Sequence, residues 1–140
     1  MKPKRPLNVG VVGLKKGKVR NDLAALRQAV DDVERLLDTE TFRKLPFSAL
    51  AIIIFYGEET DLRPKFKGID GEFLDVEIGL NMKQLQDASK ESALKDVFVW
   101  ALLKTLKGIF QKYAVEAEGL GRKLDEYKEI EGRWYQQRLG

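Results

Sequence analysis

The amino-acid sequence predicts an α+β protein in which a small mixed sheet packs against one long buried helix. Three observations support this class: a long helical pattern over residues 91–113, strand-like segments before it, and a helical pattern between the first two of those segments. The predicted order is β-α-β-β-β-α with an extra C-terminal helix. The chain of 140 residues has the size of one domain, with a core over 1–113 and a helical extension over 114–140.

The first strand is predicted over Leu7–Leu14, a short β-branched segment that contains two glycines. A basic turn then leads into an amphipathic helix that ends near Asp38. Apolar residues repeat there at intervals of three and four, which places them on one helical face. They are Leu23, Leu26, Val30, Val33 and Leu37.

The second strand is predicted over Phe47–Tyr56, which includes three consecutive isoleucines. A continuous apolar run of this length is typical of a central strand covered on both faces. On this interpretation Phe55 belongs to the core, as does Trp100 in the long helix. A strand, a helix and a strand in this order usually form a parallel crossover, so we expect the first two strands to be parallel.

A hairpin is predicted next, with strands at Arg63–Ile69 and Glu72–Leu80 and a turn at Asp70-Gly71, a dipeptide that two-residue hairpin turns favour. The second of these strands alternates clearly. One of its faces is therefore apolar, whereas the other carries Phe73 together with acidic residues.

Residues 81–90 form a short helical or looped approach to the long helix at Glu91–Tyr113. The middle of the long helix is apolar almost all round, so it must be covered on more than one side. We expect the C-terminal extension to cover the second side through Leu124, Tyr127 and Trp134. A second subunit is the alternative.

The composition restricts the chemistry open to the protein. The chain has no cysteine and no histidine, which excludes disulfides, zinc sites built from these residues and His-based general bases. We predict no cofactor, no metal site and no catalytic residue. No apolar run reaches the ~18 residues of a membrane span, and the lysine-rich start lacks the apolar core of a signal peptide. We therefore expect a cytoplasmic protein that does not bind membranes.

The charge is unevenly distributed, although the formal net charge is only +3. Residues 1–20 contain seven basic residues and no acidic one, whereas residues 57–80 contain seven acids and three bases. This distribution predicts an electrically bipolar molecule.

The basic turn before the first helix matches a phosphate-binding loop only in part. Gly13 and Gly17 are separated by three residues, and Val19 stands where a Ser or Thr would reach magnesium. The plain interpretation is an exposed basic turn. The alternative is an anion-binding site. Its residues would be Lys15, Lys16, Lys18 and Arg20.

The acidic segment also has more than one interpretation. Carboxylates on an outer sheet face are usually solvated, and paired catalytic carboxylates need a desolvated pocket, which nothing in the sequence predicts. An acidic surface with an exposed aromatic residue suits the recognition of a basic protein. The predicted partner-binding residues are Glu58, Glu59, Asp61, Phe73, Asp75 and Glu77.

Three segments resemble the immunity protein 39 family of bacterial polymorphic toxin systems. They are NVGVVGLKKGKVR at 8–20, IIIFYGEETDLRPKFKGID at 52–70 and VEIGLNMKQLQDASKESALKDVFVWALLKTLKGIFQKY at 76–113. Members of such families are encoded beside a toxin, bind it in the cytosol of the producing cell and block it. The resemblance implies a toxin domain as protein partner and no enzyme activity, and it carries no map of the contact residues.

We therefore predict an immunity protein that neutralises a toxin domain through a protein–protein interface and is not an enzyme. The alternative is a nucleic-acid or phosphate-ligand binding module that uses the basic N-terminal turn. A third hypothesis is an enzyme that uses two of Asp70, Asp75 and Glu77. The sequence leaves the oligomeric state open.

Overall fold

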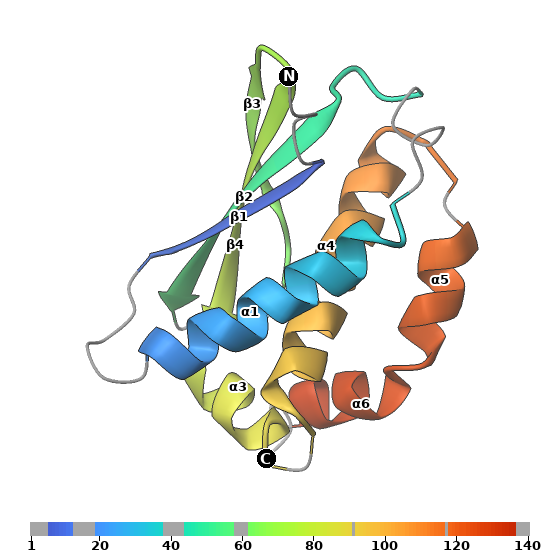
Figure 1. The fold of residues 1–140 in the computed structure, drawn as a ribbon. Coiled ribbons are helices and arrows are strands. Elements are labelled where there is room, and N and C mark those ends of the chain that lie inside the picture. The colour runs from blue at the N-terminus through green and yellow to red at the C-terminus, as the bar shows by residue number, and fades with distance from the viewer. Residues whose placement is uncertain are drawn as a thin grey trace.

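The computed structural model describes residues 6–12, 19–37, 44–57, 62–90, 92–116 and 118–136, which form one four-stranded sheet and five helices (Figure 1). The elements are β1 (Leu7–Val12), α1 (Val19–Glu34), β2 (Ala49–Gly57), β3 (Lys65–Asp70), β4 (Phe73–Asn81), α3 (Met82–Ala88), α4 (Leu94–Lys112), α5 (Glu118–Asp125) and α6 (Lys128–Gln136). The predicted α+β class with a mixed sheet is confirmed.

The strands lie in the order β1-β2-β4-β3. β2 is parallel to both β1 and β4, whereas β3 is antiparallel to β4. The predicted parallel crossover from β1 through α1 to β2 is therefore confirmed. β1 and β3 form the two edges of the sheet.

The hairpin between β3 and β4 is present, with its turn one residue later than predicted. Asp70 lies opposite Phe73, so Gly71 and Glu72 are the two turn residues. Gly71 has a φ of +61°, in the left-handed region that only glycine adopts at no steric cost. The register shifts between Phe66 and Gly68, which places a β-bulge in edge strand β3.

The core lies between the sheet and the helices. α1 and α4 cover one face of the sheet (Figure 1), and the residues of the two central strands that point to this side are buried. They are Leu50, Ile52 and Ile54 of β2 and Leu74, Val76, Ile78 and Leu80 of β4. α4 is buried continuously from Val97 to Leu103, as its nearly all-round apolar pattern requires.

The C-terminal extension covers the second side of α4, which confirms that prediction. The Trp134 ring in α6 packs on Trp100 with ring centroids 5.3 Å apart, and the Gln84 side-chain Nε2 donates to the Trp134 carbonyl oxygen over 2.8 Å. Leu124 is buried as well, whereas Tyr127 is only half-buried.

The extension forms two helices where one was predicted. Backbone hydrogen bonds from Glu126 to Lys123 and from Tyr127 to Leu124 span only three residues, which tightens the end of α5. Gly119 and Gly121 both lie within α5. A glycine weakens a helix by only about 1 kcal/mol relative to alanine, and the burial of the neighbouring Leu120 opposes that cost.

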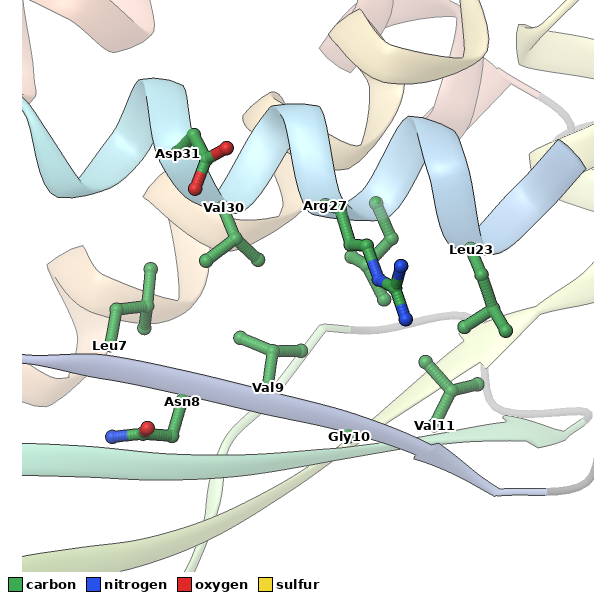
Figure 2. Close-up of a pocket in the computed structure, with 10 residues that line it drawn as sticks. Leu7, Asn8, Val9, Gly10, Val11, Leu23, Arg27, Val30 and Asp31 are labelled. Carbon is green, nitrogen blue, oxygen red and sulfur yellow. The ribbon is translucent and has the colours of Figure 1, made fainter. Parts of the chain in front are cut away.

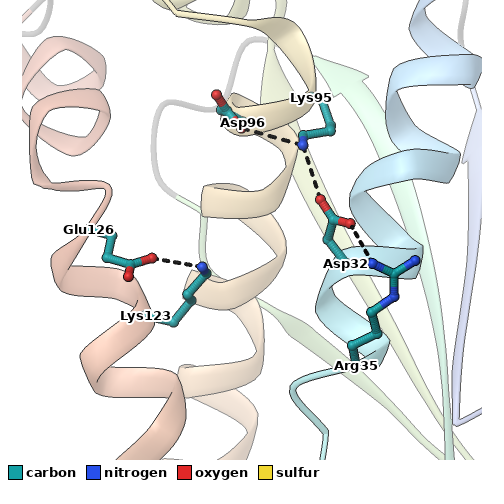
Figure 3. Close-up of polar contacts among 6 residues, drawn as sticks. All are labelled: Asp32, Arg35, Lys95, Asp96, Lys123 and Glu126. Atoms are coloured by element: carbon teal, nitrogen blue, oxygen red, sulfur yellow. Dashed lines mark ion pairs between the residues drawn. The ribbon is translucent and has the colours of Figure 1, made fainter.

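Ion pairs accompany the apolar contacts between helices (Figure 3). Lys95 Nζ of α4 lies 3.1 Å from an Asp32 carboxylate oxygen of α1, and the hydrogen bond with Asp32 raises the pKa of Lys95. Lys123 and Glu126 form a 2.7 Å pair at the end of α5. These pairs are partly exposed, so their contribution to stability is small.

β2 is covered on one face only, which corrects two expectations. Ile53 is 39% exposed and Phe55 is 37% exposed, so Phe55 is not a core residue and β2 is not covered on both faces. The reason is that α1 and α4 lie on the same side of the sheet, and no described element covers the other side (Figure 1). An apolar run in the sequence is the same whether its second face is buried or exposed.

Candidate partner-binding face

The uncovered side of the sheet, which we call the open face, is the candidate functional site. Successive side chains of a strand point to opposite faces, so the residues that alternate with the core positions gather here. The open face comprises Asn8 and Gly10 of β1, Ala51, Ile53 and Phe55 of β2, Phe73, Asp75, Glu77 and Gly79 of β4, and Lys65 and Lys67 of β3.

Apolar side chains lie at the centre of the open face. Strand register places Ile53 between Gly10 and Glu77 in one row, and Phe55 beside Gly79 in the next. Because Gly10 and Gly79 have no side chains, Ile53 and Phe55 each lack one neighbour that would cover them. The exposure of Ile53 and Phe55 therefore depends on the glycines of β1 and β4 as well as on the position of β2 in the sheet.

Charged side chains of both signs lie beside this apolar centre. Glu77 is in register with Lys65 and lies 3.6 Å from Lys67, measured between carboxylate oxygen and ammonium nitrogen. Asp75 lies opposite Gly68, so its cross-strand neighbour has no side chain. The described part of the face is thus a mixed surface that can meet either sign of charge on a partner.

The structure brings three of the predicted partner-binding residues together. Phe73, Asp75 and Glu77 share the open face and are each half-buried. Glu58, Glu59 and Asp61 lie outside the described residues. They follow Gly57, the last residue of β2, which lies beside Asn81 at the end of β4. Phe73 is at the other end of β4, eight residues or about 26 Å away from Asn81 along the strand.

The alternative anion-binding site is not described. Lys15, Lys16 and Lys18 lie outside the described residues, and Arg20 belongs to α1 but its side chain is not described. The structure therefore does not test the basic turn.

Ile53, Phe55 and Lys67 belong to the face but were not among the predicted site residues. The sequence could have indicated Ile53 and Phe55, because strand alternation puts them on the opposite face from Ile52 and Ile54. Lys67 could not have been assigned, since the bulge in β3 changes which side chains of that strand reach the face.

A groove lies beside the free edge of β1, under α1 (Figure 2). It has a volume of about 440 Å³. Its apolar lining comes from Leu7, Val9 and Val11 of β1 and from Leu23, Leu26 and Val30 of α1. Arg27 and Asp31 of α1 add charges to its wall.

The described part of the chain contains neither a metal-binding cluster nor a membrane-spanning helix. No cluster of three or more acidic side chains is placed there to hold a metal ion. None of the described helices is long and apolar enough to cross a membrane.

Comparison with known proteins identifies the family. The model of the immunity protein 39 family matches residues 1–124, a region that includes all four strands and therefore the whole open face. A search of curated proteins and a search of solved structures each found no match. Because the family model matches most of its length, the chain belongs to the immunity protein 39 family.

Proposed function

We propose that the chain binds a cognate bacterial toxin domain in the cytoplasm of the cell that produces both proteins, and neutralises it through the open face. Membership in the immunity protein 39 family implies an immunity protein with a toxin partner. The toxin of a polymorphic toxin system and the interface on the sheet are our extension of that assignment.

The observation that carries the proposal is the exposure of Ile53 and Phe55 on the open face. Stable interfaces have an apolar, aromatic-rich centre surrounded by polar residues. Ile53 and Phe55 suit such a centre, with Phe73 farther along the same face. The strands that present them are anchored by a buried opposite face, so these side chains need little reorganisation on binding.

The charges beside the apolar centre suit selection among partners. Lys67 and Glu77 are 53% and 29% exposed at the side chain, so their ion pair adds little to folding. Both groups can therefore exchange their mutual contact for a contact with the partner at small cost. Such charges affect association rate and specificity more than affinity.

Neutralisation in this proposal needs binding and no chemistry. A toxin domain is blocked when the interface covers its active surface or prevents its substrate from reaching it. We therefore expect protection to follow the occupancy of the complex, with one immunity protein required for each toxin molecule.

The decisive experiment combines the chain with the toxin domain encoded by the adjacent gene. We expect the two to co-purify and the chain to protect cells that express the toxin. Gly10→Arg tests the surface, because a Cβ at Gly10 would meet no atom within 4 Å, so a long side chain can extend across the open face beside Ile53. Affinity should fall at least about tenfold with unchanged thermal stability.

Gly132→Arg in α6 is the matched control, since a Cβ there also meets no atom within 4 Å, and it should bind the toxin normally. The double substitution Asp75→Lys with Glu77→Lys should also weaken binding. Normal protection by both open-face variants would exclude this face as the interface. A failure of the wild-type chain to bind any toxin domain would reject the proposed function.

A further inference from the structure

We propose that the free edge of β1 and the groove under α1 form a second docking site, where an acidic, extended segment of the toxin adds to the sheet as a fifth strand. This rests on the proposed function, because it takes the toxin as the partner. Beyond that function, the inference specifies which kind of toxin segment binds: one that is extended and acidic.

The backbone of β1 offers a free row of donors and acceptors. Among the strands that the structure describes, β1 pairs with β2 alone, and the Leu50 N–H donates to the Pro6 carbonyl over 2.8 Å. Because strand residues alternate in the direction of their backbone groups, Asn8 and Gly10 also bond to β2. Leu7, Val9 and Val11 therefore direct their N–H and C=O groups toward the free edge.

The side chains of the same three residues line the groove, opposite Leu23 and Val30 of α1 (Figure 2). Val9 and Val11 are only partly buried. A strand added beside β1 would bond to the free backbone groups and send alternate side chains into the groove. This is the geometry of strand addition, in which main-chain bonds supply affinity and side-chain pockets supply specificity.

The two edges of the sheet differ in their protection against pairing. β3 carries Lys65 and Lys67 and a bulge next to Gly68, which are the usual means of preventing edge-to-edge association. β1 is six residues long and contains no charge and no proline. The chain thus protects one edge of the sheet and leaves the other suited to a partner strand.

The charges near β1 favour an acidic segment as the occupant. Arg27 and Asp31 are both exposed and put one charge of each sign on the wall of the groove. The Arg27 side chain points from α1 toward β1, whereas Asp31 lies beside Val30 (Figure 2), so the excess of positive charge comes from the segments that flank β1. In the sequence, three cations precede β1 and three more follow it before α1 begins, with no acid among them: Lys2, Lys4, Arg5, Lys15, Lys16 and Lys18. Pairing two copies of β1 would bring two such basic flanks together, so like-charge repulsion disfavours a second copy as the occupant.

Residue-resolved amide hydrogen exchange of the intact chain, free and bound to the co-purified toxin domain, tests the inference. In the free chain the amides of Leu7, Val9 and Val11 should exchange quickly, whereas those of Asn8 and Gly10 are already protected by β2. In the complex we expect the first three to slow by at least about tenfold, because each gains a hydrogen bond.

The possible outcomes separate the two proposals. A toxin complex in which these three amides still exchange quickly would overturn strand addition and leave the proposed function standing. Protection of these amides in the free chain, together with a dimer mass in solution, would assign the edge to a second copy and also overturn it. If no toxin domain binds, both proposals fail.

Two variants provide an independent measurement. Val9→Pro removes one edge N–H and no bond to β2, and should weaken toxin binding about tenfold. Arg27→Glu, at an exposed position, should weaken it about three- to tenfold and reduce its dependence on salt. Lys128→Glu in α6 makes the same change in net charge and should have no effect. If the Arg27→Glu variant binds the toxin with normal affinity, the inference that the docked segment is acidic is wrong.

Discussion

Gly10 and Gly71 have equally open surroundings and different backbone conformations. A Cβ at either position would meet no atom within 4 Å. Gly71 has a φ of +61° in the hairpin turn, whereas Gly10 lies outside the left-handed region in β1. The two residues therefore separate the effect of backbone strain from that of side-chain crowding.

Gly71→Ala should lower the free energy of unfolding by about 1–2 kcal/mol, because alanine in the left-handed region clashes with its own backbone. Gly10→Ala should leave it unchanged or raise it by up to ~1 kcal/mol, since alanine restricts the unfolded chain more than glycine does. Urea denaturation of the two variants provides the measurement. Equal losses in both would mean that the turn does not need glycine.

Glu131 links α6 to α4 by polar contacts at the edge of the core. Its two carboxylate oxygens accept hydrogen bonds from Trp100 Nε1 over 3.2 Å and from Lys104 Nζ over 3.1 Å. Burial acts to raise the pKa of Glu131, but these hydrogen bonds and the charges of Lys104 and Lys107 outweigh it, so the pKa is lowered from 4.5.

A lowered carboxyl pKa means that the unfolded chain binds more protons than the folded one. The stabilisation by Glu131 is thus complete above about pH 4.5 and lost as the pH falls through the folded value. Glu131→Gln should lower the melting temperature at pH 7, and the difference from wild type should shrink as the pH falls below about 4.5. Since the side chain is 37% exposed, we expect the effect to be below ~1 kcal/mol. Glu129→Gln, at a 92% exposed position, is the matched control.

At the scale of elements, α6 completes the core although it lies beyond the family match, which ends at residue 124. Trp134 is fully buried against Trp100, and Ile130 is buried as well. Without α6, the apolar middle of α4 would face solvent on one side. We therefore expect the C-terminal helices to belong to the domain that supports the open face.

Trp134→Ala should lower the free energy of unfolding by about 3–5 kcal/mol, because it leaves a large cavity beside Trp100. Trp134→Phe keeps an aromatic ring there and should cost less. Chemical denaturation of both variants gives the comparison. A loss below ~1 kcal/mol for the alanine variant would show that α6 packs weakly on α4.

At the scale of the whole molecule, the helices cover the sheet from one side, and no described element covers its other side. Figure 1 shows α4 between the sheet and α5, and α3 contacts both β4 and α6. This arrangement predicts that the sheet and the extension unfold together as a single domain over residues 1–140.

Equilibrium unfolding should accordingly show one transition with the same midpoint by two probes. Both tryptophans of the chain, Trp100 and Trp134, lie at the contact between α4 and α6, so fluorescence reports on the extension. Far-UV circular dichroism reports on all helices and strands. Coincident midpoints are the signature of two-state unfolding, whereas an earlier fluorescence transition would identify the extension as a separate unit.

The periodic segments were sufficient to predict most of the fold. The alternation of residues 72–80 predicted the orientation of Phe73, Asp75 and Glu77, because a strand with one buried face needs one register. The all-round apolar middle of α4 predicted cover on two sides. The expectation for Phe55 was wrong because its neighbours on the sheet are distant in sequence, and only strand register brings Gly10 and Gly79 beside β2.

The sequence by itself determined the types and order of the main elements, the buried faces of β4 and α1, the burial of the middle of α4, and the family. These features depend on local spacing and composition, which a single segment contains. The tertiary structure alone decided that both large helices lie on one side of the sheet, and that β1 is an unprotected edge beside a groove. Those features depend on which distant segments pack together, and the two surfaces that we propose for partner binding follow from them.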